Sequence, residues 1–225
     1  MALVGFFDES GEHGKRGKLR RLTLGGFFAR WENVQQLCER WRAALDAENL
    51  GEFHMKDIAS DEHLFAEWPP ERQQRLMRFA AILCDTASEF GAFSYPVMRR
   101  GRGAFVDTYG TALSRVLIVA SELAQRTGDQ VRLVFAYTDE IREARIAEGL
   151  GLWPEFLESY KVARSRSEPA LQAAEIVARG LKRIMEDGTV PASFQAVLLT
   201  GKPIRFWPEN PIAAGAMARA MRRAE

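Results

Sequence analysis

The chain has few cysteines, no long apolar segment and almost no net charge. Its 225 residues include two cysteines and carry a formal charge of +1 at pH 7. Cys38 and Cys84 fall within helical patterns and lack the spacing of metal-binding cysteines, so we interpret them as packing thiols and expect no structural zinc site. No apolar run approaches the length of a membrane span, and acidic residues occupy the region where a signal peptide needs its hydrophobic core. We therefore expect a soluble, cytoplasmic protein with no membrane partner.

Internal repeats and low-complexity segments are also absent, and the composition is that of a globular protein. Hydrophobic residues make up 47% of the chain and charged residues 27%, which is enough apolar material for a complete core. The basic residues gather in clusters at 15–21, 99–102, 161–166 and 219–223. Basic loops can bind phosphates, although most charge runs are simply solvated surface. These clusters would favour a nucleic-acid partner if they surrounded an acidic site.

Apolar periodicity predicts strands that alternate with helices, which indicates an α/β fold. Strands are expected at residues 2–7, 21–29, 91–98 and 131–137, with the first two paired as an antiparallel hairpin and with Pro96 marking an edge or a bulge. Helices are expected at residues 31–47, 69–88, 105–125 and 170–186. A helical pattern also begins after residue 139, breaks at 149–154 and resumes into 161–166, and a short strand followed by an Ala-rich helix is expected beyond residue 190.

The first strand runs into a cluster of acidic residues. Alternation places Val4, Phe6 and Asp8 on one face, and an ionised Asp at the end of such a face is costly unless a cation or several donors neutralise it. Taken alone, the segment favours a simpler interpretation, in which Asp8 or Glu9 opens a polar turn formed by Ser10-Gly11.

A second acidic residue is predicted to face the core from the last well-defined helix. Glu175 lies four residues after Leu171 and three before Ala178, within the apolar stripe of that helix. A carboxylate in this position needs a partner, and an ion pair or cap with a neighbouring loop would be sufficient. Taken together with Asp8, Glu175 favours a shared acidic site.

Four segments, in order along the chain, carry a resemblance to a known family. LVGFFDESGEHG, LTLGGFFA, EFHMKDIA and SEPALQAAEIVA resemble the recurring blocks of the domain of unknown function 3800 family, which is grouped with the ribonuclease-H-like fold. The resemblance spans residues 3–181. It implies a ribonuclease-H-like mixed central sheet flanked by helices, with residues 1–225 as a single domain that has a helical insertion and a C-terminal extension from about residue 188.

The resemblance implies a two-metal nuclease site. In ribonuclease-H-like enzymes, carboxylates hold two Mg²⁺ or Mn²⁺ ions, which activate water and stabilise the leaving oxygen of a phosphodiester. Asp8 matches the first-strand ligand, Asp57 or Glu52 the second acidic block and Glu175 the late-helix ligand, so Asp8, Asp57 and Glu175 are the expected catalytic residues. Asp139 is a possible substitute ligand. The expected supporting residues are Glu9, Ser10, Glu12, His54 and Gln172, and the expected phosphate contacts are Lys15, Lys56 and Arg100.

Two departures from the family pattern leave the activity open. Ala136 stands where relatives commonly have an acid, and Glu175 replaces an Asp, which moves the carboxylate by about one bond length in a site that tolerates roughly 0.5 Å. The chain is therefore either a metal-dependent nuclease or a catalytically degenerate module that binds nucleic acid or protein. Either could form a homo-oligomer or belong to a larger defence or mobile-element complex. His54 could contact phosphate or merely link a loop to a helix.

Overall fold

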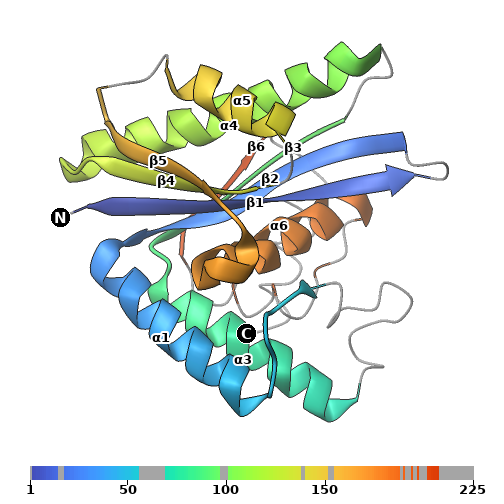
Figure 1. The fold of residues 1–225 in the computed structure, drawn as a ribbon, viewed down its shortest axis with the longest axis vertical. Helices are drawn as coiled ribbons and strands as arrows, with labels where there is room; N and C mark the ends of the chain where they lie inside the picture. The colour runs from blue at the N-terminus through green and yellow to red at the C-terminus, as the bar shows by residue number, and fades with distance from the viewer. Residues whose placement is uncertain are drawn as a thin grey trace.

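The computed structural model describes residues 2–14, 18–55, 69–96, 101–137, 140–151, 155–187, 190, 194, 197 and 202–207. Within these residues, six strands form one mixed sheet in the order β5-β4-β1-β2-β3-β6, and helices cover both of its faces (Figure 1). The predicted α/β class, a mixed central sheet flanked by helices, is confirmed. Among the helices of these residues, none is long and apolar enough to cross a membrane.

The strands of the sheet run in both directions. They are β1 (Leu3–Gly14), β2 (Lys18–Arg30), β3 (Glu89–Pro96), β4 (Val131–Ala136), β5 (Leu157–Ala163) and β6 (Ile204–Trp207). The first three form an antiparallel meander, as the expected hairpin requires. Three parallel pairs complete the sheet: β4 beside β1, β5 beside β4, and β6 beside β3.

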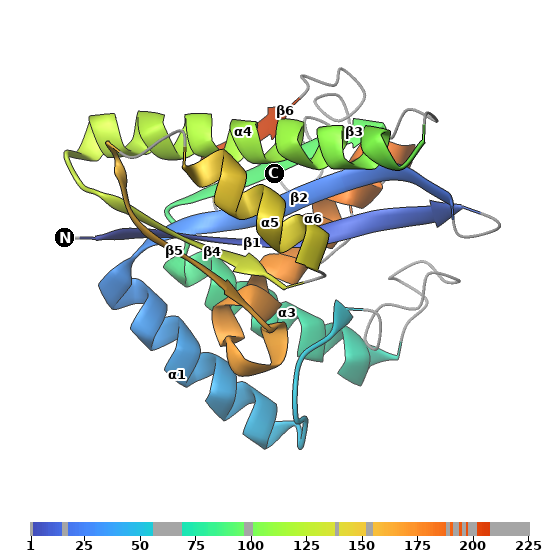
Figure 2. The same cartoon turned by 45° about the horizontal axis from the view of Figure 1, so that its top comes forward.

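The helices pack as two layers. They are α1 (Trp31–Ala47), α3 (Pro70–Thr86), α4 (Gly101–Thr127), α5 (Glu140–Leu150) and α6 (Pro169–Asp187), with a short 3₁₀ turn, η2 (Ser165–Ser167), before α6. Figure 2 shows α4 and α5 on one face of the sheet and α1, α3 and α6 on the other. The predicted bounds of α1 are confirmed, and those of α3 and α6 are correct to within two residues.

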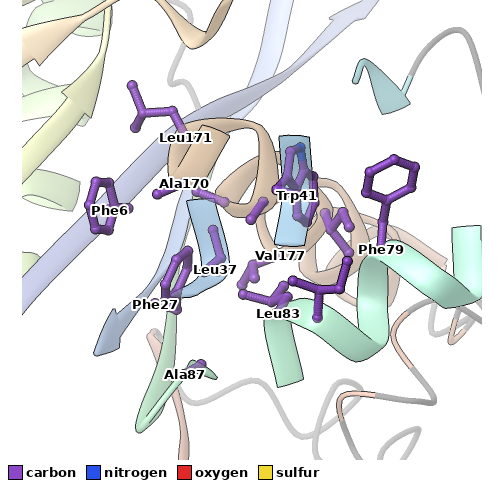
Figure 3. Close-up of a cluster of buried hydrophobic side chains, with 14 of the residues drawn as sticks. Phe6, Phe27, Leu37, Trp41, Phe79, Leu83, Ala87, Ala170, Leu171 and Val177 are labelled. Carbon is purple, nitrogen blue, oxygen red and sulfur yellow. The ribbon is translucent and has the colours of Figure 1, made fainter. Parts of the chain in front are cut away.

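Each face of the sheet has its own apolar core, and β1 contributes to both. Phe7 packs under α4 and α5, whereas Phe6 stacks on Phe27 with ring centroids 5.6 Å apart and faces α1, α3 and α6. Figure 3 shows Trp41 and Phe79 in this second core, beside Val177 of α6. Because successive residues of a strand point to opposite faces, the side chain of Asp8 follows Phe6 toward α6.

The structure corrects the predicted polar turn at Ser10-Gly11. β1 continues to Gly14 and pairs with β2 along its whole length, so Asp8 lies inside a strand opposite Gly25. Polar and glycine residues favour a turn locally, but the long ladder between the two strands supplies the backbone hydrogen bonds that a turn would otherwise provide.

A second correction concerns residues 157–166, where the sequence suggested a helix. Residues 157–163 form the edge strand β5, and most of its side chains are exposed. An edge strand has little need of strict apolar alternation, so its sequence carries a weak strand signal. Pro96 is the last residue of β3, where it pairs with Arg21 of β2 and lies beyond the four residues that pair with β6. Proline is tolerated at such a strand end.

Candidate acidic site between strand β1 and helix α6

The site is built where α6 comes unusually close to the sheet. Gly25, opposite Asp8 in the ladder, lies so near to α6 that a Cβ on it would come within 2.4 Å of the Ala178 Cα. Its neighbour Gly26 is equally restricted, since a Cβ there would lie 1.8 Å from the Phe6 carbonyl oxygen. Glu175 precedes Ala178 by three residues, on the same side of the helix. Because Gly25 has no side chain, α6 can bring Glu175 down to the face that carries Asp8, whereas the missing side chain of Gly26 leaves room for the backbone of β1.

The carboxyl groups of Asp8 and Glu175 repel one another. The pKa of Asp8 is raised from 3.8 to about 8, chiefly by burial and also by the negative charge of Glu175, while the hydrogen bond from the Glu9 N–H acts in the opposite direction. That N–H donates to Asp8 Oδ1 at 2.8 Å. Burial also raises the pKa of Glu175, although His54 and the Met55 N–H act in the opposite direction. Two desolvated acids that disfavour each other's ionised form are a typical environment for a proton or a cation.

Glu175 is fixed by the loop that precedes the undescribed segment 56–68. Its Oε1 accepts a hydrogen bond from the Met55 N–H at 3.2 Å, and its Oε2 lies 3.3 Å from His54 Nδ1. The other ring nitrogen of His54, Nε2, lies 3.3 Å from Glu52 Oε1. The His54 and Glu52 side chains are 28% and 33% exposed and that of Glu175 is 17% exposed, so this row of three groups leads from solvent inward.

Gln172 holds the same loop against α6. Its Oε1 accepts hydrogen bonds from Trp41 Nε1 at 3.1 Å and from the Phe53 N–H at 2.9 Å, while its Nε2 donates to the Ser165 carbonyl at 3.1 Å. The Gln172 side chain is buried, and these bonds occupy its amide oxygen fully. Gln172 thus acts as a positioning residue that places His54 and Met55 beside Glu175.

The structure brings together four of the residues that the sequence singled out, namely Asp8, Glu52, His54 and Glu175. Glu9 contributes its backbone N–H to Asp8, and strand alternation directs its side chain to the opposite face. Ser10 and Glu12 lie further along β1. Five predicted residues lie outside the described ones: Lys15, Lys56, Asp57, Arg100 and Asp139.

Sequence reasoning missed two contributors to the site, the backbone of Met55 and the close approach at Gly25. The glycine pair in LTLGGFFA was the available signal for the second, because consecutive glycines in a strand often mark close approach of another backbone. No side-chain pattern could have indicated the first, since a backbone N–H is present at almost every position.

Ala136 stands beside Asp8. The parallel ladder pairs Phe6 with Val134 and Phe7 with Phe135, so the next position along β4 is adjacent to Asp8. Ala136 packs against the same core as Phe6 and Val134. The acid that the family resemblance led us to expect at this position would therefore have pointed to the face that holds Asp8 and Glu175.

Within the described part of the chain, no group of three or more His, Cys, Asp and Glu side chains is arranged to hold a metal ion. The donors that do approach one another, Asp8 and Glu175, are carboxylates, and carboxylate oxygen is the ligand type that Mg²⁺ and Mn²⁺ prefer. The chemistry of this pair fits a divalent ion, and burial is the main cause of the raised pKa of both carboxyl groups, while His54 and Arg179 lower the pKa of Glu175.

Comparison with known proteins leaves the family unassigned. No family model matches the chain, and no curated protein matches it. Among solved structures, it is similar to a chain of "Structure of the PCNA:RNase HII complex from Archaeoglobus fulgidus", with a TM-score of 0.39 and 12% sequence identity over 99% of this chain and 90% of that one.

Proposed function

We propose that this protein is a metal-dependent nuclease that hydrolyses phosphodiester bonds of nucleic acid. The observation that carries the proposal is the mutual repulsion of Asp8 and Glu175, two desolvated carboxylates on facing elements with raised pKa values. A structural ion pair would combine opposite charges, whereas this pair combines like charges and is costly to bury. Such an arrangement is typical of sites that act on a cation or a proton.

Asp8 and Glu175 would hold a Mg²⁺ or Mn²⁺ ion, with Glu52 near the solvent side and with Asp57 and Asp139 as further predicted ligands. The bound ion would supply a water of lowered pKa and neutralise negative charge at the phosphate. His54 orients Glu175, because its Nδ1 lies 3.3 Å from Glu175 Oε2. The Met55 N–H fixes the other carboxylate oxygen, so the ligand is held before any ion arrives.

A second candidate function rests on Ala136. Because this alanine occupies the place beside Asp8 where the family resemblance implies an acid, the protein could have lost catalysis and retained a nucleic-acid-binding or protein-interaction role. Membership of the domain of unknown function 3800 family, and a single domain over residues 1–225 with an extension from about residue 188, remain part of the proposal.

A cleavage assay tests the proposed activity. The wild-type chain is incubated with single-stranded, duplex and RNA–DNA hybrid substrates in Mg²⁺ or Mn²⁺, beside Asp8→Asn, Glu175→Gln and Asp57→Asn. A matched control is Glu148→Gln, which removes an exposed carboxylate on the opposite face. We expect cleavage by the wild type and the control, and at least a hundredfold loss in the site variants, the order of effect found when electrostatic stabilisation of a transition state is removed.

Cleavage that persists undiminished in Asp8→Asn would rule out the assigned site. Binding without cleavage in either metal would favour the degenerate module.

A further inference from the structure

A surface pocket lies next to the acidic site, at the start of α6. It has a volume of about 260 Å³. Arg42 of α1 and Arg166 of η2 line it, together with Asp46, Gly51 and Gln172, and the wall is completed by Ser167 and apolar side chains. Arg166 belongs to the basic cluster 161–166, which the acidic site does not use.

The groups that face this pocket suit an anion. Arg42 and Arg166 are exposed, and neither forms an ion pair with any of the described residues. Their two guanidinium groups outnumber the single carboxylate of Asp46. Guanidinium groups bind phosphate oxygens through paired N–H donors, which distinguishes them from a simple positive surface.

Gln172 supplies a further donor at the buried side of the pocket. A glutamine side chain has two N–H groups and two acceptor positions on its oxygen. Both acceptor positions are used, by Trp41 and Phe53, but among the described residues only one N–H has a partner, the Ser165 carbonyl. The second N–H belongs to a side chain that is 2% exposed and lines the pocket. A buried donor of this kind needs an acceptor.

The pocket and the acidic site share their elements. Glu175 follows Gln172 by three residues on α6, about 4.5 Å along the helix axis. Gly51 lines the pocket, and Glu52 and His54 of the same loop belong to the acidic site. A phosphodiester chain carries a charge at every nucleotide, about 3.4 Å of axial rise apart in one strand of a duplex. One strand therefore presents its phosphates at a spacing of the same order as the separation of Gln172 and Glu175 along α6.

We propose that this pocket binds a backbone phosphate of the nucleic acid, on the strand whose neighbouring phosphate lies at Asp8 and Glu175. Arg42, Arg166 and the free N–H of Gln172 hold the phosphate oxygens. The inference rests on the proposed function, because it takes the substrate to be a nucleic acid. It adds a positioning subsite that sets the register of the strand and contributes to affinity.

Binding in EDTA tests the subsite without any cleavage. Fluorescence anisotropy with a labelled single-stranded oligonucleotide is measured across salt concentrations for the wild type and for Arg42→Gln/Arg166→Gln. The matched control is Arg40→Gln/Arg145→Gln, which removes the same charge from ion-paired arginines on α1 and α5. We expect the pocket variant to bind about tenfold more weakly, and the slope of log K against log salt to fall by about 0.7, the contribution of one neutralised phosphate.

Inorganic phosphate supplies a second readout, since it should shift the side-chain amide signals of Gln172 in ¹⁵N NMR spectra of the wild type but not of the pocket variant. Pocket and control variants that bind alike would overturn the proposal. So would binding that depends on a 5′-terminal phosphate, because the pocket would then recognise a strand end. Weaker binding by the pocket variant, without any cleavage by the wild type, would support the pocket and contradict the nuclease. Cleavage by the wild type, with equal binding by the pocket and control variants, would support the nuclease and overturn the pocket.

Discussion

Gly25 of β2 lies against Ala178 of α6 with no room for a side chain between them, since a Cβ on Gly25 would come within 2.4 Å of the Ala178 Cα. The clash would involve backbone atoms, which cannot rotate away as a side chain can. Asp8 is the ladder partner of Gly25, and Glu175 precedes Ala178 by one helical turn. The distance between the sheet and α6 at this point therefore sets the distance between the two acids.

Gly25→Ala should push α6 away from the sheet. We expect a loss of about 1–3 kcal/mol in the free energy of unfolding, the usual cost of overpacking a core, together with a fall of the raised pKa of Asp8 toward its ordinary value as the two acids separate. Urea denaturation measures the first effect and NMR titration of the Asp8 carboxyl carbon the second.

Gly110→Ala is the control, because nothing lies within 4 Å of a Cβ built on this helical glycine. It should leave the Asp8 titration unchanged and stabilise the protein by up to about 1 kcal/mol. Equal behaviour of the two variants would contradict the packing argument.

Gln172→Leu should loosen the loop that carries His54. The substitution keeps much of the volume but leaves the Trp41 Nε1–H and the Phe53 N–H without their acceptor. Each buried donor left in this state costs about 1–3 kcal/mol, so we expect a loss of at least about 2 kcal/mol in the free energy of unfolding and faster hydrogen exchange at Phe53. Gln36→Leu, at an exposed position of α1, is the matched control and should change neither quantity.

Asp8 should make the stability of the protein fall as the pH rises. Its pKa is about 8 in the folded protein and about 4 in an unfolded chain. The folded state therefore holds the proton more tightly, and the resulting stabilisation is fully present below pH 4 and is lost as the pH rises through 8. In EDTA, the melting temperature of the wild type should decline relative to that of Asp8→Asn between pH 6 and pH 9.

Divalent ions should reverse this decline, because a bound cation favours the ionised carboxylate and its binding releases the proton. Mn²⁺ should therefore raise the melting temperature of the wild type more at pH 8.5 than at pH 6, and should have little effect on Asp8→Asn. A difference between wild type and variant that stays constant with pH would show that Asp8 keeps an ordinary pKa.

Local patterns were sufficient to predict most elements of this fold but only part of its site. The stripe of α6 was readable because Leu171, Ala174 and Ala178 recur at helical spacing, and it placed Glu175 on the inner face correctly. The extension of β1 through Ser10 and Gly11 was not readable, because it depends on pairing with β2 rather than on the residues themselves. β5 was missed for a related reason: as an exposed edge strand it is held by the parallel ladder to β4, which no local pattern encodes.

Ala136→Asp separates the two candidate functions most directly. Val134 and Ala136 share the Phe6 side of the sheet, so the new carboxylate would join Asp8 and Glu175 on one face. Without metal, a third negative charge in a desolvated place should lower the free energy of unfolding and raise the pKa of Asp8 still further. With Mn²⁺, the additional oxygen ligand should tighten ion binding and restore the stability, which isothermal titration calorimetry and thermal melts would measure.

The effect of Ala136→Asp on cleavage then decides between the candidates. If the wild type is a degenerate module, the substitution should produce Mn²⁺-dependent cleavage that Asp8→Asn abolishes. If the wild type is already active, its ligand set is complete without residue 136, and the extra charge should reduce the rate. Ala136→Asn introduces a side chain of nearly the same shape as Asp but without the charge. It should therefore neither produce cleavage in a degenerate module nor slow an active enzyme. The same result from the Asp and Asn variants would mean that position 136 does not face the ion, and the placement of the site beside β4 would be wrong.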